Sequence, residues 1–537
     1  MIGADAIVKC LEAEKVEQVF GYPGVAICPF YNSILDSKVR TILVRTEQNA
    51  AHAASGVARM TGRPGVCAVT SGPGATNIIT GIATAFADSI PLVVITGQVN
   101  SELLGSDVFQ EADITGATES FVKYSYLVRN VQDIPRIFKE AFYIANSGRK
   151  GPVLIDVPID IQNAYVSKFS YPSEVSLRTY KPTVKGNAVQ MKKVVYELGN
   201  AHRPIICAGG GVLTSGAKLL VRSFAEQHGI PVVTTMMGKG VMPTDHPLYY
   251  GMVGNNGIDY ANRAMNEADV IMMVGARVAD RAVNQPDLIT KGKTLIHIDV
   301  DPAEIGKNAI STIPLVGDAK TIFQDLVEMK FSGDYDDWIG TLEEYRVNQK
   351  NRRNPSAAYV DPARFIAMLS GAMEENAVYV ADVGQNQIWS CANAVIRKGR
   401  FLTSGGMGTM GYSIPCALGA KLAEPDRQVV AVCGDGSFQM SMMELATFVQ
   451  HHIQAKIVVI SNGYLGMVRQ YQHYAYKDHY SVVSLDGSPD LEKLVSAYGF
   501  DYLRLENMRN AKRVIEKFLK DENNVLLECI VDPMDLV

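Results

Sequence analysis

One stretch, residues 429–469, restricts what this chain can fold into more than any other. An apolar run at 429–433 reads as a buried strand, and a glycine turn follows it at once. A helical pattern then covers 440–449, and a second apolar run at 456–460 predicts the next strand. The order strand, glycine turn, helix, strand is typical of a parallel sheet in an open α/β fold.

Polar residues follow both predicted strands of this stretch. Asp435 comes after the first strand, and Asn462 comes after the second. Because ligands of open α/β sheets bind at the carboxyl ends of the strands, both side chains are expected to face a ligand. A carboxylate and an amide oxygen suit a hard cation that keeps substrate phosphates among its ligands, and the free N–H groups of Gly434 and Gly436 suit the phosphates. An aspartate that only caps a helix would explain the helix start but not Asn462.

The two ends of the chain have the same order of elements. Segments 65–97 and 428–463 each read as a strand, a glycine loop, a helix and a second strand. The elements predicted in the first part of the chain are helices at 4–14, at 49–60 and up to 87, and strands at 18–20, 41–44, 65–70 and 91–96. This alternation with short loops predicts doubly wound parallel sheets.

The middle of the chain reads as a third α/β unit. Its predicted strands lie at 204–207, 232–235, 270–274 and 295–299. A glycine loop at 209–211 makes this a Rossmann-like series with a nucleotide-type site. Polar segments at about 167–185 and 334–355 predict linkers, and the charges of the second, Arg352 and Arg353 among them, favour a solvated helix face. The predicted domains are 1–166, 186–333 and 356–537.

Composition limits the class of protein. The 537 residues are 47% apolar and carry a net charge of −5, which favours a packed soluble chain over one that binds nucleic acid or an anionic membrane surface. No apolar run approaches the roughly twenty residues that cross a bilayer, and no secretory signal is visible. The eight cysteines are scattered, and Cys67 and Cys433 lie in apolar strand patterns, which predicts reduced thiols in a cytoplasmic protein.

Two further features each have two interpretations. Residues 406–411 match G-x-G-x-x-G, the dinucleotide fingerprint, but no strand ending in an acid follows about twenty residues later, so close approach to a different cofactor explains these glycines better. Glu47 ends a predicted strand and begins a helix of small residues, and such crowded, dry surroundings suit a proton relay. A plain carboxylate favoured by the helix dipole is the other interpretation of Glu47.

Gly-Asp-Gly at 434–436, followed by Asn462, resembles the metal and diphosphate motif of thiamine-diphosphate enzymes. Other stretches narrow the resemblance to the acetolactate (acetohydroxyacid) synthase large-subunit family, and it covers essentially the whole chain. The stretches that carry it lie at 21–24, 45–48, 70–77, 89–94, 109–113, 147–149, 297–308, 404–411, 434–440 and 465–470. Those at 109–113 and 297–308 are specific to the synthase rather than to thiamine enzymes generally.

This resemblance implies thiamine diphosphate, Mg²⁺ and a structural FAD as cofactors. Glu47 would bond to the pyrimidine ring, and Met410 would support the bent cofactor. The residues implied to bind Mg²⁺ are Asp435, Asn462 and, through its carbonyl, Tyr464. The other residues implied to bind thiamine diphosphate are Gly24, Gly72, Gly74, Asn77, Gln385, Gly408, Gly434, Gly436, Ser437, Gly463 and Met467. Those implied to hold FAD are Arg149, Gly210, Gly211, Thr235, Gly275, Arg277, Asp299 and Asp318.

The implied reaction decarboxylates pyruvate on thiamine diphosphate and adds the hydroxyethyl unit to a second 2-keto acid, which gives 2-acetolactate from two pyruvates. Gln110 would line the pocket, and the guanidinium of Arg277 would hold the carboxylate of the second keto acid. In this family the active site lies between subunits, so a homodimer or homotetramer is expected. The resemblance leaves open a regulatory small subunit as a further partner.

Three residues and two segments depart from the family pattern. Val25 stands where a second glycine is usual, Ile159 where a lysine is usual, and Tyr471 where a tryptophan is linked to preference for larger acceptors. Segments 255–256 and 277–281 differ as well. These changes fall on the acceptor pocket and the flavin cleft.

Three other functions stand beside the synthase. A related thiamine-diphosphate decarboxylase or lyase on another 2-keto acid or a diketone would use the same cofactor site with a reshaped pocket. A flavin oxidoreductase resembling pyruvate oxidase would bleach its flavin with pyruvate. A non-catalytic binding protein is disfavoured because Glu47, Asp435 and Asn462 are all present.

Overall fold

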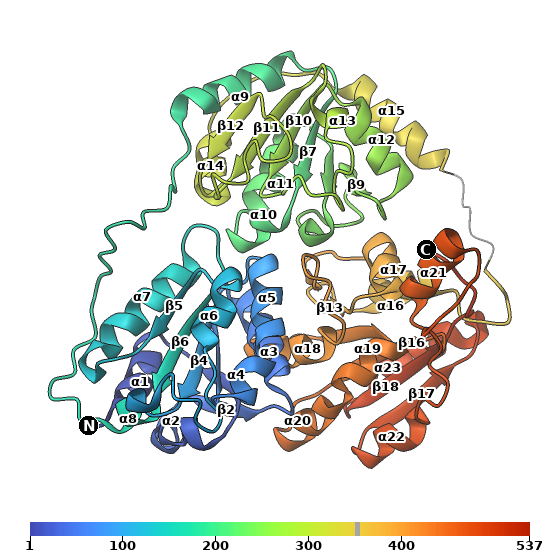
Figure 1. The fold of residues 1–537 in the computed structure, drawn as a ribbon. Helices are drawn as coiled ribbons and strands as arrows, with labels where there is room; N and C mark the ends of the chain where they lie inside the picture. The colour runs from blue at the N-terminus through green and yellow to red at the C-terminus, as the bar shows by residue number, and fades with distance from the viewer. Residues whose placement is uncertain (350–354) are drawn as a thin grey trace.

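Three parallel β-sheets of six strands each form the body of the molecule (Figure 1). The computed structural model describes residues 1–349 and 355–537, so Arg352 and Arg353 lie outside the described residues. In Figure 1 the middle part of the chain lies above the other two units, which lie side by side. The predicted fold class, with three doubly wound α/β units, is confirmed.

The N-terminal unit carries the first sheet. Its strands, in their order across the sheet, are β2 (Arg40–Leu43), β1 (Gln18–Tyr22), β3 (Gly65–Val69), β4 (Leu92–Gln98), β6 (Pro152–Pro158) and β5 (Tyr124–Leu127). Its longer helices are α1 (Gly3–Ala13), α2 (Cys28–Ile34), α3 (Glu47–Thr61), α5 (Ile79–Ala87) and α7 (Ile134–Asn146). β3, β4 and β6 are buried along their whole length, which explains their mostly apolar sequences.

The C-terminal unit repeats that topology. Its strands, in order, are β14 (Arg400–Leu402), β13 (Val378–Ala381), β15 (Val429–Gly434), β16 (Lys456–Ser461), β18 (Val525–Ile530) and β17 (Asp501–Leu505). Its helices include α16 (Pro362–Ala372), α17 (Gln385–Asn393), α18 (Ser413–Ala423), α19 (Asp435–Ser441), α20 (Leu445–Gln450), α21 (Gly466–Tyr476), α22 (Leu491–Ala497) and α23 (Ala511–Lys520). Counted within each unit, both sheets run in the order 2-1-3-4-6-5, so the predicted likeness of the two ends is confirmed.

The middle unit has a different strand order. Its strands, from one edge to the other, are β9 (Tyr249–Met252), β8 (Val232–Thr234), β7 (Pro204–Ala208), β10 (Val270–Val274), β11 (Thr294–Asp299) and β12 (Ile313–Val316). Counted within the unit this is 3-2-1-4-5-6, the order of a Rossmann fold, as the sequence predicts. Its helices include α9 (Ala188–Asn200), α10 (Gly210–Thr214), α11 (Lys218–His228), α12 (Asp259–Glu267), α14 (Ala319–Leu326) and α15 (Asp336–Val347).

Helices α3 and α18 hold the N- and C-terminal units together (Figure 1). Two glycines allow their backbones to come into contact. A Cβ atom at Gly56 would overlap the carbonyl of Cys416, and one at Gly419 would overlap the carbonyl of Ala53. The Ser55 and Tyr412 hydroxyls, 2.8 Å apart, add a buried hydrogen bond between the two units.

Two predicted helices differ from the structure. The helix expected at 440–449 begins five residues earlier, at Asp435, and a 3₁₀ turn at Met442–Glu444 separates α19 from α20. The helix expected to end at 87 is two helices, α4 (Pro73–Asn77) and α5, joined at Ile78. In both places the glycine turn itself starts the helix, a local effect that an apolar pattern does not reveal.

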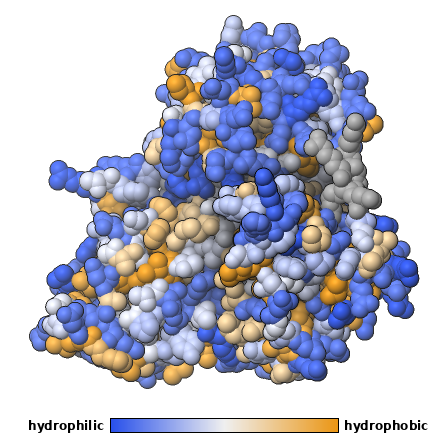
Figure 2. Space-filling model, turned by 45° about the vertical axis from the view of Figure 1, so that its right-hand side comes forward, coloured by the Kyte–Doolittle hydropathy of each residue, from blue (hydrophilic) through white to orange (hydrophobic). Residues whose placement is uncertain are grey.

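The connecting segments and the surface complete the description. Residues 167–185 form no helix or strand, and α15 lies within the second polar segment, where buried Trp338 donates to the carbonyl of Pro204 at 3.1 Å. Within the described ranges, no helix is both long and apolar enough to cross a bilayer. All eight cysteines are free thiols, and only Cys28 is exposed. Figure 2 shows hydrophilic residues over most of the middle unit and hydrophobic ones mixed among them below.

Candidate cofactor site in two halves

The first half of the site lies at the carboxyl ends of β1, β2 and β3. Glu47 is the first residue of α3, because the extended residue Thr46 before it caps the helix by accepting from the Asn49 backbone N–H. The Glu47 carboxylate is nearly buried, at 9% exposure. It accepts a hydrogen bond from the side-chain amide of Asn77 at 3.0 Å, and this amide fixes its orientation.

Glycines shape the space beside Glu47. A Cβ atom at Gly24 would lie 2.6 Å from the Thr70 side chain, and one at Gly74 would lie 2.8 Å from it and 3.4 Å from Glu47 Oε1. The Thr70 hydroxyl is buried and has no hydrogen-bond partner. These residues follow β1 and β3, between which the strand order reverses, so they stand at the switch point where open α/β sheets bind ligands.

Gln110 lies against Gly72. Both residues have positive φ angles, +61° and +58°, and a Cβ atom at Gly72 would lie 2.9 Å from the Cα, Cβ and carbonyl of Gln110. Position 72, in the turn that follows β3, must therefore be glycine for the Gln110 loop to approach. The structure thus brings together Gln110, Gly24, Gly72, Gly74, Asn77 and Glu47.

The second half lies at the carboxyl ends of β13, β15 and β16. Asp435 opens α19, and its carboxylate accepts N–H bonds from Asn462 at 3.1 Å, Gly463 at 2.6 Å and Gly436 at 3.0 Å. Burial raises the pKa of Asp435, although these N–H groups act in the opposite direction. The amide oxygen of Asn462 accepts from the Tyr464 backbone N–H at 2.9 Å. Asp435 and Asn462 therefore meet at one sheet edge.

The chemistry of these donors fits a cation that brings its own anion. Among the described residues, no group of three or more His, Cys, Asp and Glu side chains could hold a metal ion. One carboxylate, one amide oxygen and a nearby carbonyl leave a Mg²⁺ ion needing further oxygen ligands, which a diphosphate supplies.

Groups suited to phosphate surround Asp435. Gln385, at the start of α17, accepts from the Asn462 amide at 3.1 Å, and a Cβ atom at Gly466 would overlap it. The side-chain oxygen of Asn386 is buried without a partner, and Ser437 donates to the Val383 carbonyl at 3.1 Å. Helices α17, α19 and α21 all begin here, and their free N–H groups favour an anion. Gly434, Gly463 and Met467 belong to the same turns.

The loop between β14 and α18 reaches the same place. Gly408 has a φ of +68°, and the Met410 methyl lies 3.5 Å from where a Cβ atom at Gly436 would be. Met410 thus lies over the glycine turn that follows β15. This is the segment that matches G-x-G-x-x-G.

The two halves are held by separate hydrogen-bond networks. No hydrogen bond joins Glu47 or Asn77 to Asp435 or Asn462, all of which lie in the described ranges. The N-terminal half is tied instead to buried Glu444, which accepts from the Arg45 N–H at 2.8 Å and the Asn49 amide at 2.9 Å.

The residues expected to hold FAD have partners within the chain. A Cβ atom at Gly211 would lie 2.6 Å from Gly275, and one at Gly210 would lie 3.1 Å from Met237, so protein atoms already fill the space beside these glycines. Arg149 pairs with Asp301 at 3.2 Å and with Glu304 at 3.0 Å.

The acidic members of the flavin set also serve the fold. Asp299 accepts from the Asp301 N–H at 2.9 Å, and burial raises its pKa to about 6. Asp318 caps α14, and the Thr235 N–H donates to the Ala208 carbonyl. None of the eight residues has a buried side-chain nitrogen or oxygen without a hydrogen-bond partner.

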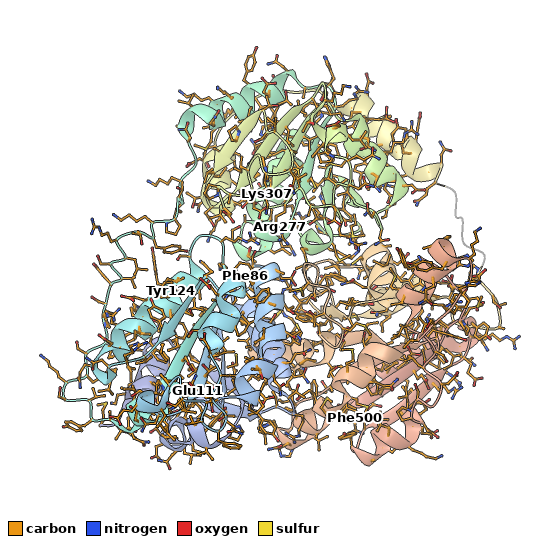
Figure 3. All side chains as sticks on the ribbon, in the orientation of Figure 1. Phe86, Glu111, Tyr124, Arg277, Lys307 and Phe500 are labelled. Atoms are coloured by element: carbon orange, nitrogen blue, oxygen red, sulfur yellow. The ribbon has the colours of Figure 1, made fainter. Side chains whose placement is uncertain are left out.

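Arg277 points out of the middle unit toward the N-terminal one. Figure 3 shows it at the edge that faces α5, where Phe86 is labelled, and it donates to the carbonyl of Ala87 at 2.9 Å. It therefore lies at a junction between units. Of the departing residues, Val25 is 76% exposed beside Gly24, and Tyr471 is 63% exposed on α21.

Comparison with known proteins agrees with this geometry. Family models of the thiamine pyrophosphate enzymes match residues 1–117 (N-terminal TPP binding domain), 191–326 (central domain) and 382–529 (C-terminal TPP binding domain). The two halves thus lie in the two domains that define this class of cofactor-dependent enzyme.

Similar proteins specify the family. A probable acetolactate synthase large subunit from Methanocaldococcus jannaschii is 42% identical, with 100% of this chain and 93% of that protein aligned. Acetolactate synthase large subunits from Lactococcus lactis (40%, covering 100% and 93%) and Corynebacterium glutamicum (41%, covering 99% and 87%) are also similar. The chain belongs to the acetolactate synthase large-subunit family.

Four residues at or behind the two halves are not among the predicted site residues. Thr70 lies within the stretch 70–77, which resembles the family and so carries a signal for this residue. Asn386 follows Gln385 directly. Glu444 and Asp88 have no local signal, because their partners lie in another unit of the chain.

Proposed function

We propose that this protein is the catalytic subunit of an acetolactate synthase, which joins two 2-keto acids with loss of carbon dioxide. The observation that carries the proposal is the pair of half-sites: Glu47 held by Asn77 in one, and Asp435 beside Asn462 in the other. The names and coverage of the similar proteins support the same reaction. Two pyruvates would give 2-acetolactate.

Each half-site residue has a proposed task. Asp435, Asn462 and the Tyr464 carbonyl hold Mg²⁺, and the N–H groups of Gly434 and Gly436 hold the diphosphate. When bound, thiamine diphosphate supplies a carbon nucleophile and an electron sink for decarboxylation. Among the remaining residues, Gln385, Asn386, Ser437, Gly463 and Met467 border the diphosphate, and Gly24, Gly72, Gly74, Gly408 and Met410 border the rings.

The N-terminal half is assigned the proton transfer. Glu47 would hold the pyrimidine ring of bound thiamine diphosphate and be the group that exchanges a proton with it, and Asn77 keeps the Glu47 side chain aimed. Gln110 lines the substrate pocket from its strained loop, and Arg277 binds the carboxylate of the acceptor keto acid. The nearly buried position of Glu47 keeps water from competing for that proton.

A second copy of the chain is part of this proposal. Because no hydrogen bond joins the two halves among the described residues of one chain, we infer that the N-terminal half of one copy and the C-terminal half of another enclose each cofactor. Phe109, 87% exposed beside Gln110, and Val25, 76% exposed, give the N-terminal half an apolar rim for such a contact. A homodimer is the smallest assembly with complete sites.

Flavin binding stays a prediction, because the Gly210–Gly211 loop and Arg149 already have partners in the protein. The visible absorption spectrum of the purified protein tests it directly. No step of the proposed reaction depends on FAD.

The proposed function is tested by supplying purified protein with thiamine diphosphate, Mg²⁺ and pyruvate, then measuring the acetoin released by acid. Glu47→Gln keeps an acceptor for Asn77 but removes the proton-exchanging group, so the rate should fall by about 10²-fold or more. Acetoin in the wild type that is lost in the variant supports the synthase.

The opposite result has a defined meaning as well. If a folded, cofactor-loaded wild type forms no acetoin, the synthase proposal is wrong. Release of aldehyde or carbon dioxide from other 2-keto acids or diketones would then favour a decarboxylase or lyase whose pocket is reshaped by Val25, Ile159 and Tyr471.

A further inference from the structure

Two buried carboxylates hold the loop between β14 and α18 by its backbone. Asp382, in the C-terminal unit, accepts N–H bonds from Gly411 at 2.9 Å and Ser413 at 2.8 Å. Asp88 accepts from Gly405 at 3.2 Å and from Gly406 at 2.6 Å. The loop that carries Gly408 and Met410 is therefore fixed on both sides.

Asp88 belongs to the other unit of the cofactor site. It is the residue that ends α5 in the N-terminal unit, and its exposure is 9%. Burial raises the pKa of Asp88, whereas the guanidiniums of Arg59 and Arg277 and the two N–H groups favour its charged form. The negative charge of Asp88 is thus compensated by these groups at a point where all three units meet.

Residues near Asp88 also form hydrogen bonds with the same loop. Arg59 donates to the Thr403 carbonyl at 2.6 Å, at the start of the loop. The hydroxyls of Thr84 and Thr409 are 2.7 Å apart, so α5 touches the loop one residue before Met410.

The contact leaves no room to slide. A Cβ atom at Gly406 would lie 2.9 Å from Ala87 and Asp88, and one at Gly405 would overlap the Met237 sulfur. The path of the loop therefore depends both on its two glycines and on the position of α5.

We propose that Asp88 is a positioning residue for the cofactor: by holding Gly405 and Gly406 it sets where Met410 lies over Gly436. The inference rests on the proposed function, which makes this loop a cofactor support. A carboxylate offers an acceptor oxygen to each of the two N–H groups, whereas an amide in its place would direct an NH₂ group at one of them. The N-terminal unit thereby shapes the cofactor half-site of its own chain.

The test compares Asp88→Asn with Asp269→Asn in the full-length protein. Asp269 also accepts two backbone N–H bonds, from His202 at 2.8 Å and Arg203 at 2.9 Å, but it lies in the middle unit away from the loop. Calorimetric titration with thiamine diphosphate in excess Mg²⁺ gives the Kd, and thermal unfolding without cofactor reports the fold.

We expect Asp88→Asn to raise the Kd for thiamine diphosphate by about ten-fold or more, since it loses a hydrogen bond to a charged acceptor. Asp269→Asn should lower the unfolding temperature and leave the Kd within about two-fold. Thr84→Val removes the second contact of α5 with the loop and should raise the Kd by a smaller factor, which keeps the test available if Asp88→Asn does not fold.

An unchanged Kd in both Asp88→Asn and Thr84→Val would overturn the inference and leave Asp88 a purely structural residue. Failure of the proposed function looks different, because the wild type itself would then not bind thiamine diphosphate or form acetoin. Tight binding by the wild type with weakened binding by Asp88→Asn supports the inference whatever the acceptor keto acid is.

Discussion

Asp156 shows how a single buried carboxyl makes this fold sensitive to pH. It lies on β6 at 2% exposure and accepts hydrogen bonds from the Thr96 hydroxyl at 2.6 Å and the Gln98 amide at 3.0 Å. Burial raises its pKa to about 7, against the lowering effect of these two donors. The folded state therefore holds this proton far more tightly than the unfolded chain does.

This shift predicts a loss of stability with rising pH. The stability that protonated Asp156 contributes is complete below its ordinary pKa of 3.8 and is lost as pH rises through about 7. Asp156→Asn cannot ionise, so its unfolding free energy does not fall in this way. As pH rises from 3.8 to about 7, the variant should become progressively more stable than wild type, by on the order of 2–4 kcal/mol in unfolding free energy in total. Denaturant unfolding at several pH values measures the difference.

A matched control is a carboxyl whose pKa is shifted in the opposite direction. Asp490 is exposed, and its hydrogen bonds with Lys493 lower its pKa. The difference between Asp490→Asn and wild type should therefore stay flat from about pH 5 to 8. A flat difference for Asp156→Asn as well would contradict the prediction.

Helices α3 and α18 are the elements through which the two cofactor-binding units meet. α3 begins at Glu47 and α18 follows the loop that carries Met410, so their contact fixes both halves of the site relative to one another. The contact depends on Gly56 and Gly419, where backbone meets backbone.

Gly419→Ala should loosen this contact. The added methyl would overlap the Ala53 carbonyl, so the helices must separate, at a cost of about 1–3 kcal/mol. Gly371→Ala is the control: it lies in α16 with nothing within 4 Å of the new Cβ, and should be neutral or stabilise by up to about 1 kcal/mol. Urea unfolding followed by circular dichroism distinguishes them, and equal stability of the two variants would contradict this account.

How well these elements can be predicted depends on how far apart in the sequence the interacting residues lie. The strands at 204–207 and 456–460 and the turns at Gly72 and Gly436 have local signals, because apolar runs and glycines act on their own neighbours. Asp435 and Asn462 could be paired because parallel strands end at one edge. Asp88 could not be, because its partners Gly405 and Gly406 are more than 300 residues away.

At the scale of the whole molecule, one chain contains both half-sites, in two units that α3 and α18 hold together. Glu444 ties the Glu47 side of the N-terminal unit to the back of α20, while Asp435 lies at the start of α19. An exposed apolar side chain lies near each half: Phe109, 87% exposed, stands beside Gln110, and Val482, 92% exposed, stands next to Val483, which accepts from the Leu465 N–H. Both side chains would be covered if two copies exchanged halves, which is the arrangement that a two-fold interface produces.

Mixing two inactive variants tests this arrangement. Glu47→Gln removes the N-terminal half and Asp435→Ala the C-terminal half, so each homodimer should be inactive. In a mixed dimer one site combines both substitutions and the other combines neither. Random exchange gives half mixed dimers with one intact site each, so activity should return to about a quarter of the wild-type value. If each site were built from a single chain, every site in the mixture would carry one substitution. Acetoin production that stays at the level of the separate variants, after subunit exchange has been verified with differently tagged chains, would therefore show that one chain completes its own site.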